Sequence, residues 1–329
     1  RWGGRWLGLA STALLACFPM FYAMSRHFYL EFALTAMVTL TVYLLLATDG
    51  FQRRPLSLLF GLSLGLGLLT KRTFSVFLVG PLLVVILTSG LLPALWERLH
   101  DRLRLYWKQT LLALAGGLIL ATIWFCPHRD TAQTLILGDG LLFVWWALAA
   151  LAIYFVALPA APLSNALSAV FLAATLASTW YLARVEIVER MVLNGYGVNE
   201  PRGSALELDI LDTYLFYIRR LDNEHFSTIL ALLLVAVLIL AAVATLRRQR
   251  TARRALRQVR AQGWAVLAWI AGGYALLTFS IYQETRAFLP VLPAVALICG
   301  AALQKLPWRR LRLGLLALAL AFGLVQFLA

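Results

Sequence analysis

Three short stretches of this chain place ionisable residues beside long apolar runs, where charge is unexpected. Glu31 stands directly before one apolar segment, and Arg286 stands directly before another. Lys71 and Arg72 together interrupt the otherwise apolar residues 56–89. Because a charge at membrane depth costs about 2.5–3.5 kcal/mol, each of these groups is a candidate for function.

These residue types favour the binding of a negatively charged headgroup. A phosphate needs fixed positive charge, and the planar fork of an arginine such as Arg286 or Arg26 matches it with two hydrogen bonds. A carboxylate such as that of Glu31 would then face a hydroxyl or amine acceptor. Further candidates within the same stretches are His27, Tyr282 and Glu284.

Each candidate also has a purely structural interpretation. Glu31 and Arg26 are five residues apart and could simply pair with each other, as could Glu284 with Arg286. The pair Lys71 and Arg72 could extend to lipid phosphates as interfacial anchors. On spacing alone, these interpretations stay open beside the functional ones.

The cysteine and histidine spacing predicts no metal site and no cofactor. Cys17, Cys126 and Cys299 share no metal-ligand spacing, and each lies in or at the edge of an apolar segment. A small buried hydrophobic residue is the simpler interpretation of each.

The elements that must position these groups are membrane-spanning helices. Hydrophobic residues make up 62% of the 329 residues, and apolar runs of about 17–25 residues can cross a bilayer. The expected spans, about 11 in number, are 7–24, 32–48, 56–70, 74–89, 110–125, 141–158, 163–182, 228–246, 264–281, 287–303 and 313–329. Because these segments do not alternate apolar and polar residues, we expect an all-α polytopic transmembrane helical bundle and not a barrel.

The charges indicate which loops face the cytoplasm. If residue 1 is cytoplasmic, most of the 29 Lys and Arg residues fall inside and most of the 15 acidic residues fall outside, as the positive-inside rule predicts. The cytoplasmic basic loops are then 90–109 and 247–263, and the long periplasmic loop is 183–227, with an amphipathic helix expected over 206–221. Residues 1–329 would form a single transmembrane domain in a bacterial inner membrane. The net charge of +14 is explained by membrane lipids as partners, without nucleic acid.

The three charged stretches together resemble one family, the GT-C glycosyltransferases that use polyprenyl-phosphate sugars. The branch concerned includes protein O-mannosyltransferases and lipid A aminoarabinose transferases. Pro19 followed by residues 25–35 is similar to the second outer loop of that branch, where an acid opens the next helix. Residues 61–73 resemble its glycine-rich helix ending in Thr-Lys, and residues 286–293 resemble its Arg-x-x-Leu-Pro-x-x-Pro motif.

The resemblance implies roles for these residues. Glu31 would be a catalytic acid of the outer face, close to the acceptor or the donor sugar. The phosphate of the donor would be bound by Lys71, Arg286, Arg26 and Arg72. In the family the principal base lies in an earlier outer loop, so we expect this chain to be an N-terminally truncated fragment that lacks it.

The activity implied is transfer of a sugar from a polyprenyl-phosphate donor to an acceptor lipid, glycan or protein, with inversion at the anomeric carbon. The active site would face the periplasm. Two other classes stay open: a transporter or flippase of lipid-linked sugars, and a polymerase or ligase of O-antigen type. Transporters often contain internal repeats and helices broken at the membrane midplane, and this sequence shows neither.

Overall fold

The computed structural model describes residues 4–26, 29–91, 106–125, 135–184, 215, 217–219, 227–248, 261–278 and 285–328. Within these ranges the chain is helical, without a strand, which confirms the all-α prediction. The elements are α1 (Gly4–Ala16), α2 (Pro19–Ser25), α3 (Leu30–Ala47), α4 (Arg54–Thr70), α5 (Phe74–Thr88), α7 (Trp107–Phe125), α8 (Leu135–Ala157), α9 (Pro162–Tyr181), η2 (Leu182–Arg184), α12 (Thr228–Arg248), α14 (Ala261–Thr278), η4 (Thr285–Val291), α15 (Leu292–Lys305) and α16 (Arg309–Leu328). Each of the eleven expected spans overlaps at least one of these helices.

Four of the described helices are long and apolar enough to cross a membrane. They are Leu30–Ala47, Pro162–Tyr181, Thr285–Lys305 and Arg309–Phe327. The pair α1 and α2 becomes a fifth if the two count as one span bent by 74°. Other apolar helices, such as α4 and α5, are shorter, so the count of about eleven crossings stays a prediction.

The bend between α1 and α2 has a local cause. Pro19 occupies the first turn of α2, where its missing N–H removes no helical hydrogen bond. The residue before a proline is pushed to extended backbone, and Phe18 has φ −72° and ψ 120°. The chain therefore changes direction at Phe18 and cannot continue α1.

The chain divides into two compact units, and the division passes through α3 and α5. The first unit comprises residues 1–39, 75–84 and 201–329, and the second comprises residues 40–74 and 85–200. In the first unit, α15 packs against α1, α12 and α14. The end of η4 and the start of α15 lie in the core, because Leu289, Val291, Leu292 and Ala294 have no exposed surface.

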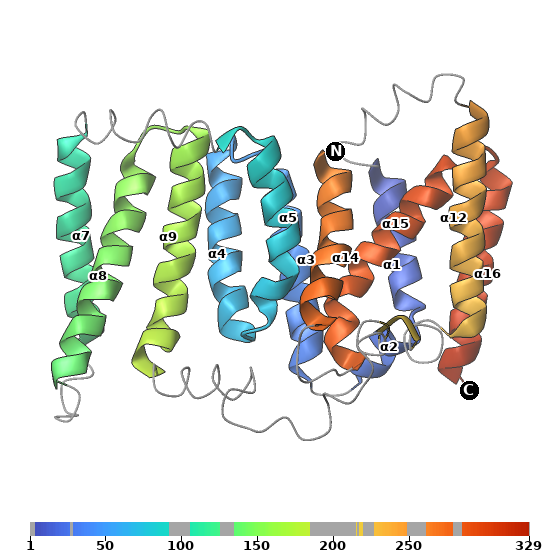
Figure 1. Ribbon diagram of the computed structural model, residues 1–329, viewed down its shortest axis with the longest axis horizontal. Coiled ribbons are helices and arrows are strands. Elements are labelled where there is room, and N and C mark those ends of the chain that lie inside the picture. The colour runs from blue at the N-terminus through green and yellow to red at the C-terminus, as the bar shows by residue number, and fades with distance from the viewer. Residues whose placement is uncertain are drawn as a thin grey trace. The chain divides into compact units, whose positions relative to one another are not determined.

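In the second unit, α7, α8, α9 and α4 lie side by side in that order (Figure 1). The Arg54 guanidinium at the start of α4 donates to the Leu158 carbonyl just before α9, at 2.6 Å. The Tyr181 hydroxyl at the end of α9 donates to the Leu68 carbonyl near the end of α4, at 2.9 Å. Helices α4 and α9 therefore run in the same direction, as helices alternating across a membrane in the predicted order would.

Two glycines allow α4 and α9 to pack closely. A Cβ atom at Gly61 would lie 2.5 Å from the carbonyl oxygen of Ala169, and one at Gly65 would lie 2.9 Å from the Cβ of Leu176. Small residues four apart let two helix backbones approach in a way that larger side chains prevent. The glycine-rich sequence of α4 is thus a packing surface for α9.

The predicted amphipathic helix at 206–221 lies mostly outside the described residues. Residues 215 and 217–219 are described and are helical. The Tyr217 ring is fully buried and stacks on Phe288 of η4, with ring centroids 5.5 Å apart. This part of the long loop therefore packs against the element that carries Arg286.

Candidate functional site

Glu31 is a buried acid in the first turn of α3. The side chain is 6% exposed, although a glutamate is almost never fully buried in a protein interior unless it is paired. Its place at the start of a helix is favourable, because the positive end of the helix dipole stabilises a carboxylate there. The Thr35 hydroxyl donates to the Glu31 backbone carbonyl at 2.7 Å, one helical turn further on.

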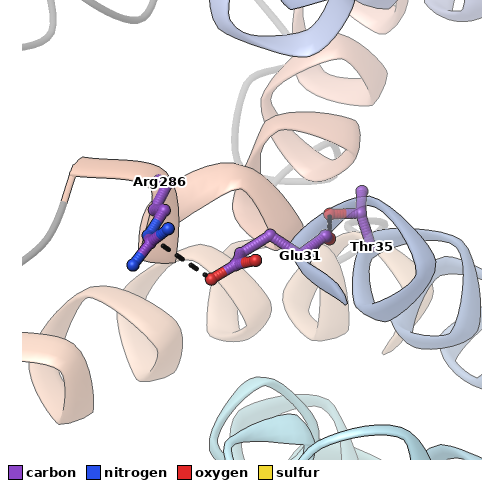
Figure 2. Close-up of polar contacts among 3 residues, drawn as sticks. All are labelled: Glu31, Thr35 and Arg286. Atoms are coloured by element: carbon purple, nitrogen blue, oxygen red, sulfur yellow. Dashed lines mark hydrogen bonds and ion pairs between the residues drawn. The ribbon is translucent and has the colours of Figure 1, made fainter. Parts of the chain in front are cut away.

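The partner of the Glu31 carboxylate is Arg286. The Nε atom of Arg286 lies 3.6 Å from Oε1 of Glu31, and Figure 2 shows the guanidinium pointing toward the carboxylate. This separation is longer than the 2.7–2.9 Å usual for a charge-assisted hydrogen bond, so the contact is an ion pair. This ion pair joins residues from different stretches, beside the two local pairings that the sequence suggested. The suggested partner Glu284 lies outside the described residues.

Arg286 also stacks on an aromatic ring that was not among the predicted site residues. Its guanidinium carbon lies 5.1 Å from the ring centroid of Tyr29, within the range of a cation–π contact. Tyr29 stands two residues before Glu31, and an aromatic residue that close to a candidate acid was the available signal. The Arg286 side chain is 35% exposed, so solvent reaches the pair mainly on the arginine side.

Proline and aromatic packing position Arg286. It belongs to the 3-10 helix η4, which contains Pro290 and leads into α15, where Pro293 occupies the first turn. Phe288, two residues after Arg286, is buried against Tyr217 and Tyr274. The arginine therefore extends from a short, well-packed element and not from a free loop.

Arg26 lies at the C-terminal end of α2 in the same unit. Its guanidinium carbon is 4.2 Å from the ring centroid of Phe327, near the end of α16. The Tyr22 hydroxyl donates to the Gln326 carbonyl at 3.2 Å, so two contacts hold the end of α16 against α2. Arg26 thus packs on α16, and its role in binding a phosphate stays a prediction.

Lys71 and Arg72 belong to the second unit, at the end of α4. Lys71 is the C-cap of α4, with extended backbone, and its carbonyl accepts from the amide of Phe74 at 3.0 Å. The Phe74 ring lies against Gly67, where any Cβ atom would overlap it. This turn leaves Lys71 half-buried and Arg72 exposed.

The predicted site residues are therefore described in two groups. The first unit brings together Glu31 and Arg286, with Tyr29 added by the structure. The second unit holds Lys71 and Arg72, and a single site that contains both groups stays a prediction. Three candidates, His27, Tyr282 and Glu284, lie outside the described residues.

Metal ligands do not gather among the described residues, where no group of three His, Cys, Asp or Glu side chains could hold an ion. Cys17 and Cys299 are both buried.

Comparison of the chain with protein-family models, curated proteins and solved structures gave no match. What defines the site is thus its own geometry, an acid and an arginine paired beside an exposed tyrosine.

Proposed function

We propose that this chain belongs to a membrane glycosyltransferase that moves a sugar from a polyprenyl-phosphate donor to an acceptor, with inversion. The observation that carries the proposal is the buried Glu31 carboxylate paired with Arg286 at one end of α3. A bundle of apolar helices does not need such an ion pair for its stability. Replacing a buried ion pair by apolar groups is often neutral or stabilising, so the pair indicates a function.

The reaction needs the charges that these residues supply. The acceptor oxygen attacks the anomeric carbon, the bond from that carbon to the phosphate oxygen breaks, and the phosphate leaves with the bonding electrons. Negative charge grows on the phosphate while the sugar passes through an oxocarbenium-like state. Cations held in place stabilise that growing charge more in the transition state than in the ground state.

The carboxylate and the cations have different tasks in this scheme. Glu31 accepts a hydrogen bond from the acceptor or from a hydroxyl group of the sugar, and Arg286 fixes the direction of that carboxylate. An arginine has five N–H donors, so one guanidinium can hold a carboxylate and a phosphate oxygen together. Lys71 and Arg72 bind the phosphate of the carrier. In the family that the sequence resembles, the proton of the acceptor goes to an acid of an earlier outer loop.

The charge pattern supports a location for the reaction. The basic loops 90–109 and 247–263 favour the cytoplasmic face of a bacterial inner membrane, which assigns the start of α3 to the periplasmic face. Tyr29, Arg286 and Arg26 would then lie at the outer boundary of the bilayer, where a lipid-linked donor presents its headgroup.

The test is transfer by the protein reconstituted in lipid vesicles. Vesicles receive radiolabelled polyprenyl-phosphate mannose or polyprenyl-phosphate aminoarabinose, with a cell-envelope extract as the source of acceptor. Release of sugar from the solvent-extractable donor is then followed by thin-layer chromatography. We expect Glu31→Gln and Lys71→Ala each to lower transfer by roughly tenfold or more, the range of a lost acid–base or charge contact.

Arg53→Gln is the matched control, because Arg53 is an exposed cation at the opposite end of α4 from Lys71. It should leave transfer unchanged, and all variants should insert and purify as the wild type does. Near-normal transfer by both site variants would contradict the proposal. Movement of intact donor between leaflets without cleavage would indicate a flippase instead.

A further inference from the structure

The Tyr217 ring carries part of the long loop 183–227 into the core of the first unit. Its side chain has no exposed surface, whereas Ile218 and Arg219 beside it are exposed. A tyrosine ring that is completely buried removes a large apolar area from solvent, and this holds the segment that carries the ring. Tyr217 therefore attaches this part of the loop to the packed helices.

Tyr217 lies in a group of three aromatic rings that come from three segments of the chain. Its ring stacks on Phe288 of η4, with centroids 5.5 Å apart and 24° between the ring planes. It meets Tyr274 of α14 edge to face at 6.3 Å, and Tyr274 lies 6.5 Å from Phe288. All three separations fall within the roughly 4.5–7 Å that aromatic pairs prefer. The loop, α14 and η4 thus meet at this group of rings.

The backbone of η4 depends on side-chain packing for its position. A 3-10 helix has poorer hydrogen-bond geometry than an α-helix, and runs longer than about four residues are uncommon. Helix η4 has seven residues, and Pro290 within it supplies no N–H group. The contacts of its side chains must therefore fix where η4 lies.

The two halves of η4 are held by different neighbours. At its end, Val291 lies against α14, where a Cβ atom added at Gly273 would come within 3.0 Å of the valine side chain. Nearer its start, Phe288 is stacked on Tyr217 of the loop. Arg286 lies two residues before Phe288, on the half of η4 that the loop supports. Loss of the Tyr217 ring would therefore loosen the arginine and leave the end of η4 in place.

We propose that Tyr217 is a positioning residue for the transfer reaction, because it holds η4 so that Arg286 faces Glu31. It acts through the arginine and needs no contact with the donor or the acceptor. The Nε atom of Arg286 is already 3.6 Å from Oε1 of Glu31, so a small shift of η4 would separate the pair (Figure 2). This inference rests on the proposed function, in which Arg286 fixes the direction of the Glu31 carboxylate.

The first experiment measures the ion pair and needs no sugar chemistry. Glu31→Gln, Arg286→Gln and the double variant are unfolded by denaturant, and the cycle gives the coupling between the two side chains. With Tyr217 present, we expect a coupling of roughly fivefold in the unfolding equilibrium constant. When the same cycle is repeated in a Tyr217→Leu background, we expect less than about twofold, because the arginine no longer faces the carboxylate.

Three further backgrounds locate the effect. Tyr217→Phe keeps the stacked ring and should retain the coupling. Phe288→Leu removes the same stacking from the side of η4 and should abolish the coupling, so it replaces Tyr217→Leu if that variant folds poorly. Phe60→Leu is the matched control, since Phe60 is an equally buried ring that packs on Phe51 in the second unit. It should lower stability and leave the coupling unchanged.

The second experiment measures transfer in the same vesicles as above. Tyr217→Leu should lower the turnover rate by roughly tenfold, as misplacement of a group at the site does, and Tyr217→Phe should transfer as the wild type does. In an Arg286→Gln background, Tyr217→Leu should lower transfer by less than about twofold, because the group that it positions is already absent. A purely structural role would lower transfer equally in both backgrounds.

The outcomes separate this inference from the proposed function. Coupling that is absent with Tyr217 present, that survives both Tyr217→Leu and Phe288→Leu, or that falls equally in Phe60→Leu would overturn the inference. Equal loss of transfer on adding Tyr217→Leu with and without Arg286 would overturn it as well. Absence of transfer by the wild type, with Tyr217-dependent coupling observed, would count against the proposed function alone. Normal transfer by Tyr217→Leu would count against this inference alone.

Discussion

The Arg286 guanidinium reaches to 3.6 Å from the Glu31 carboxylate, although the two side chains differ sharply in burial. Glu31 is 6% exposed, whereas Arg286 is 35% exposed and keeps access to solvent. Removing either partner therefore has unequal consequences. An arginine left alone can be hydrated, but a buried carboxylate left alone cannot.

The first prediction concerns stability. We expect Arg286→Gln to destabilise the fold by about 1–3 kcal/mol, because it strands the buried carboxylate, and Glu31→Gln to cost less. The exposure of Arg286 keeps both values below those of a fully buried pair. Denaturant titration of the two single variants and the double variant measures the coupling, which should be about 1 kcal/mol. A larger loss from Glu31→Gln than from Arg286→Gln would contradict this account.

The second prediction concerns the shape of the Arg286 side chain. Arg286→Lys preserves the charge but loses the planar fork and the stacking on Tyr29. We expect sugar transfer by this variant to fall between that of the wild type and that of Arg286→Gln, measured in the same vesicles. Tyr29→Phe is the control, since it keeps the ring face and should transfer normally. Equal activity of lysine and arginine at this position would show that only charge matters.

The third prediction concerns the packing of α4 on α9. Gly61→Ala introduces a Cβ atom that would lie 2.5 Å from the Ala169 carbonyl oxygen, against backbone that cannot move aside cheaply. We expect a destabilisation of about 1–3 kcal/mol, as overpacking generally costs. Gly314→Ala, in the open surroundings of α16, is the matched control and should be neutral or slightly stabilising. Thermal unfolding in detergent compares the two, and equal midpoints would argue against the close packing.

The fourth prediction concerns sidedness. In a background with the three native cysteines changed to alanine, Ser25→Cys is exposed at the end of α2, and Arg53→Cys is exposed at the start of α4. A membrane-impermeant maleimide added to intact spheroplasts should label position 25 and spare position 53. Position 53 should react only after the membrane is opened. The reverse pattern would invert the orientation and move the proposed site to the cytoplasm.

Much of the helical framework could be predicted from sequence. Each apolar segment overlaps a helix, because a chain buried in hydrocarbon must satisfy its backbone hydrogen bonds within each segment. The glycines of α4 were equally visible as residue types. The bend at Pro19 was not predicted, and it divides the expected span 7–24 into α1 and α2. The length of each helix was less predictable. Helix α4 ends and α5 begins at the Lys71–Thr73 turn, and the packing of Phe74 on Gly67 helps to shape that turn.

The amino-acid sequence alone determined that the chain forms apolar helices and that Glu31, Lys71 and Arg286 are charges in need of a partner. Only the tertiary structure decided that Glu31 meets Arg286, that Arg26 packs on Phe327, and that the Tyr181 hydroxyl bonds the Leu68 carbonyl. Helix formation depends on neighbours along the chain, and local composition reveals it. Pairing between distant segments depends on how whole helix faces fit together, and that fit is established only when the helices pack.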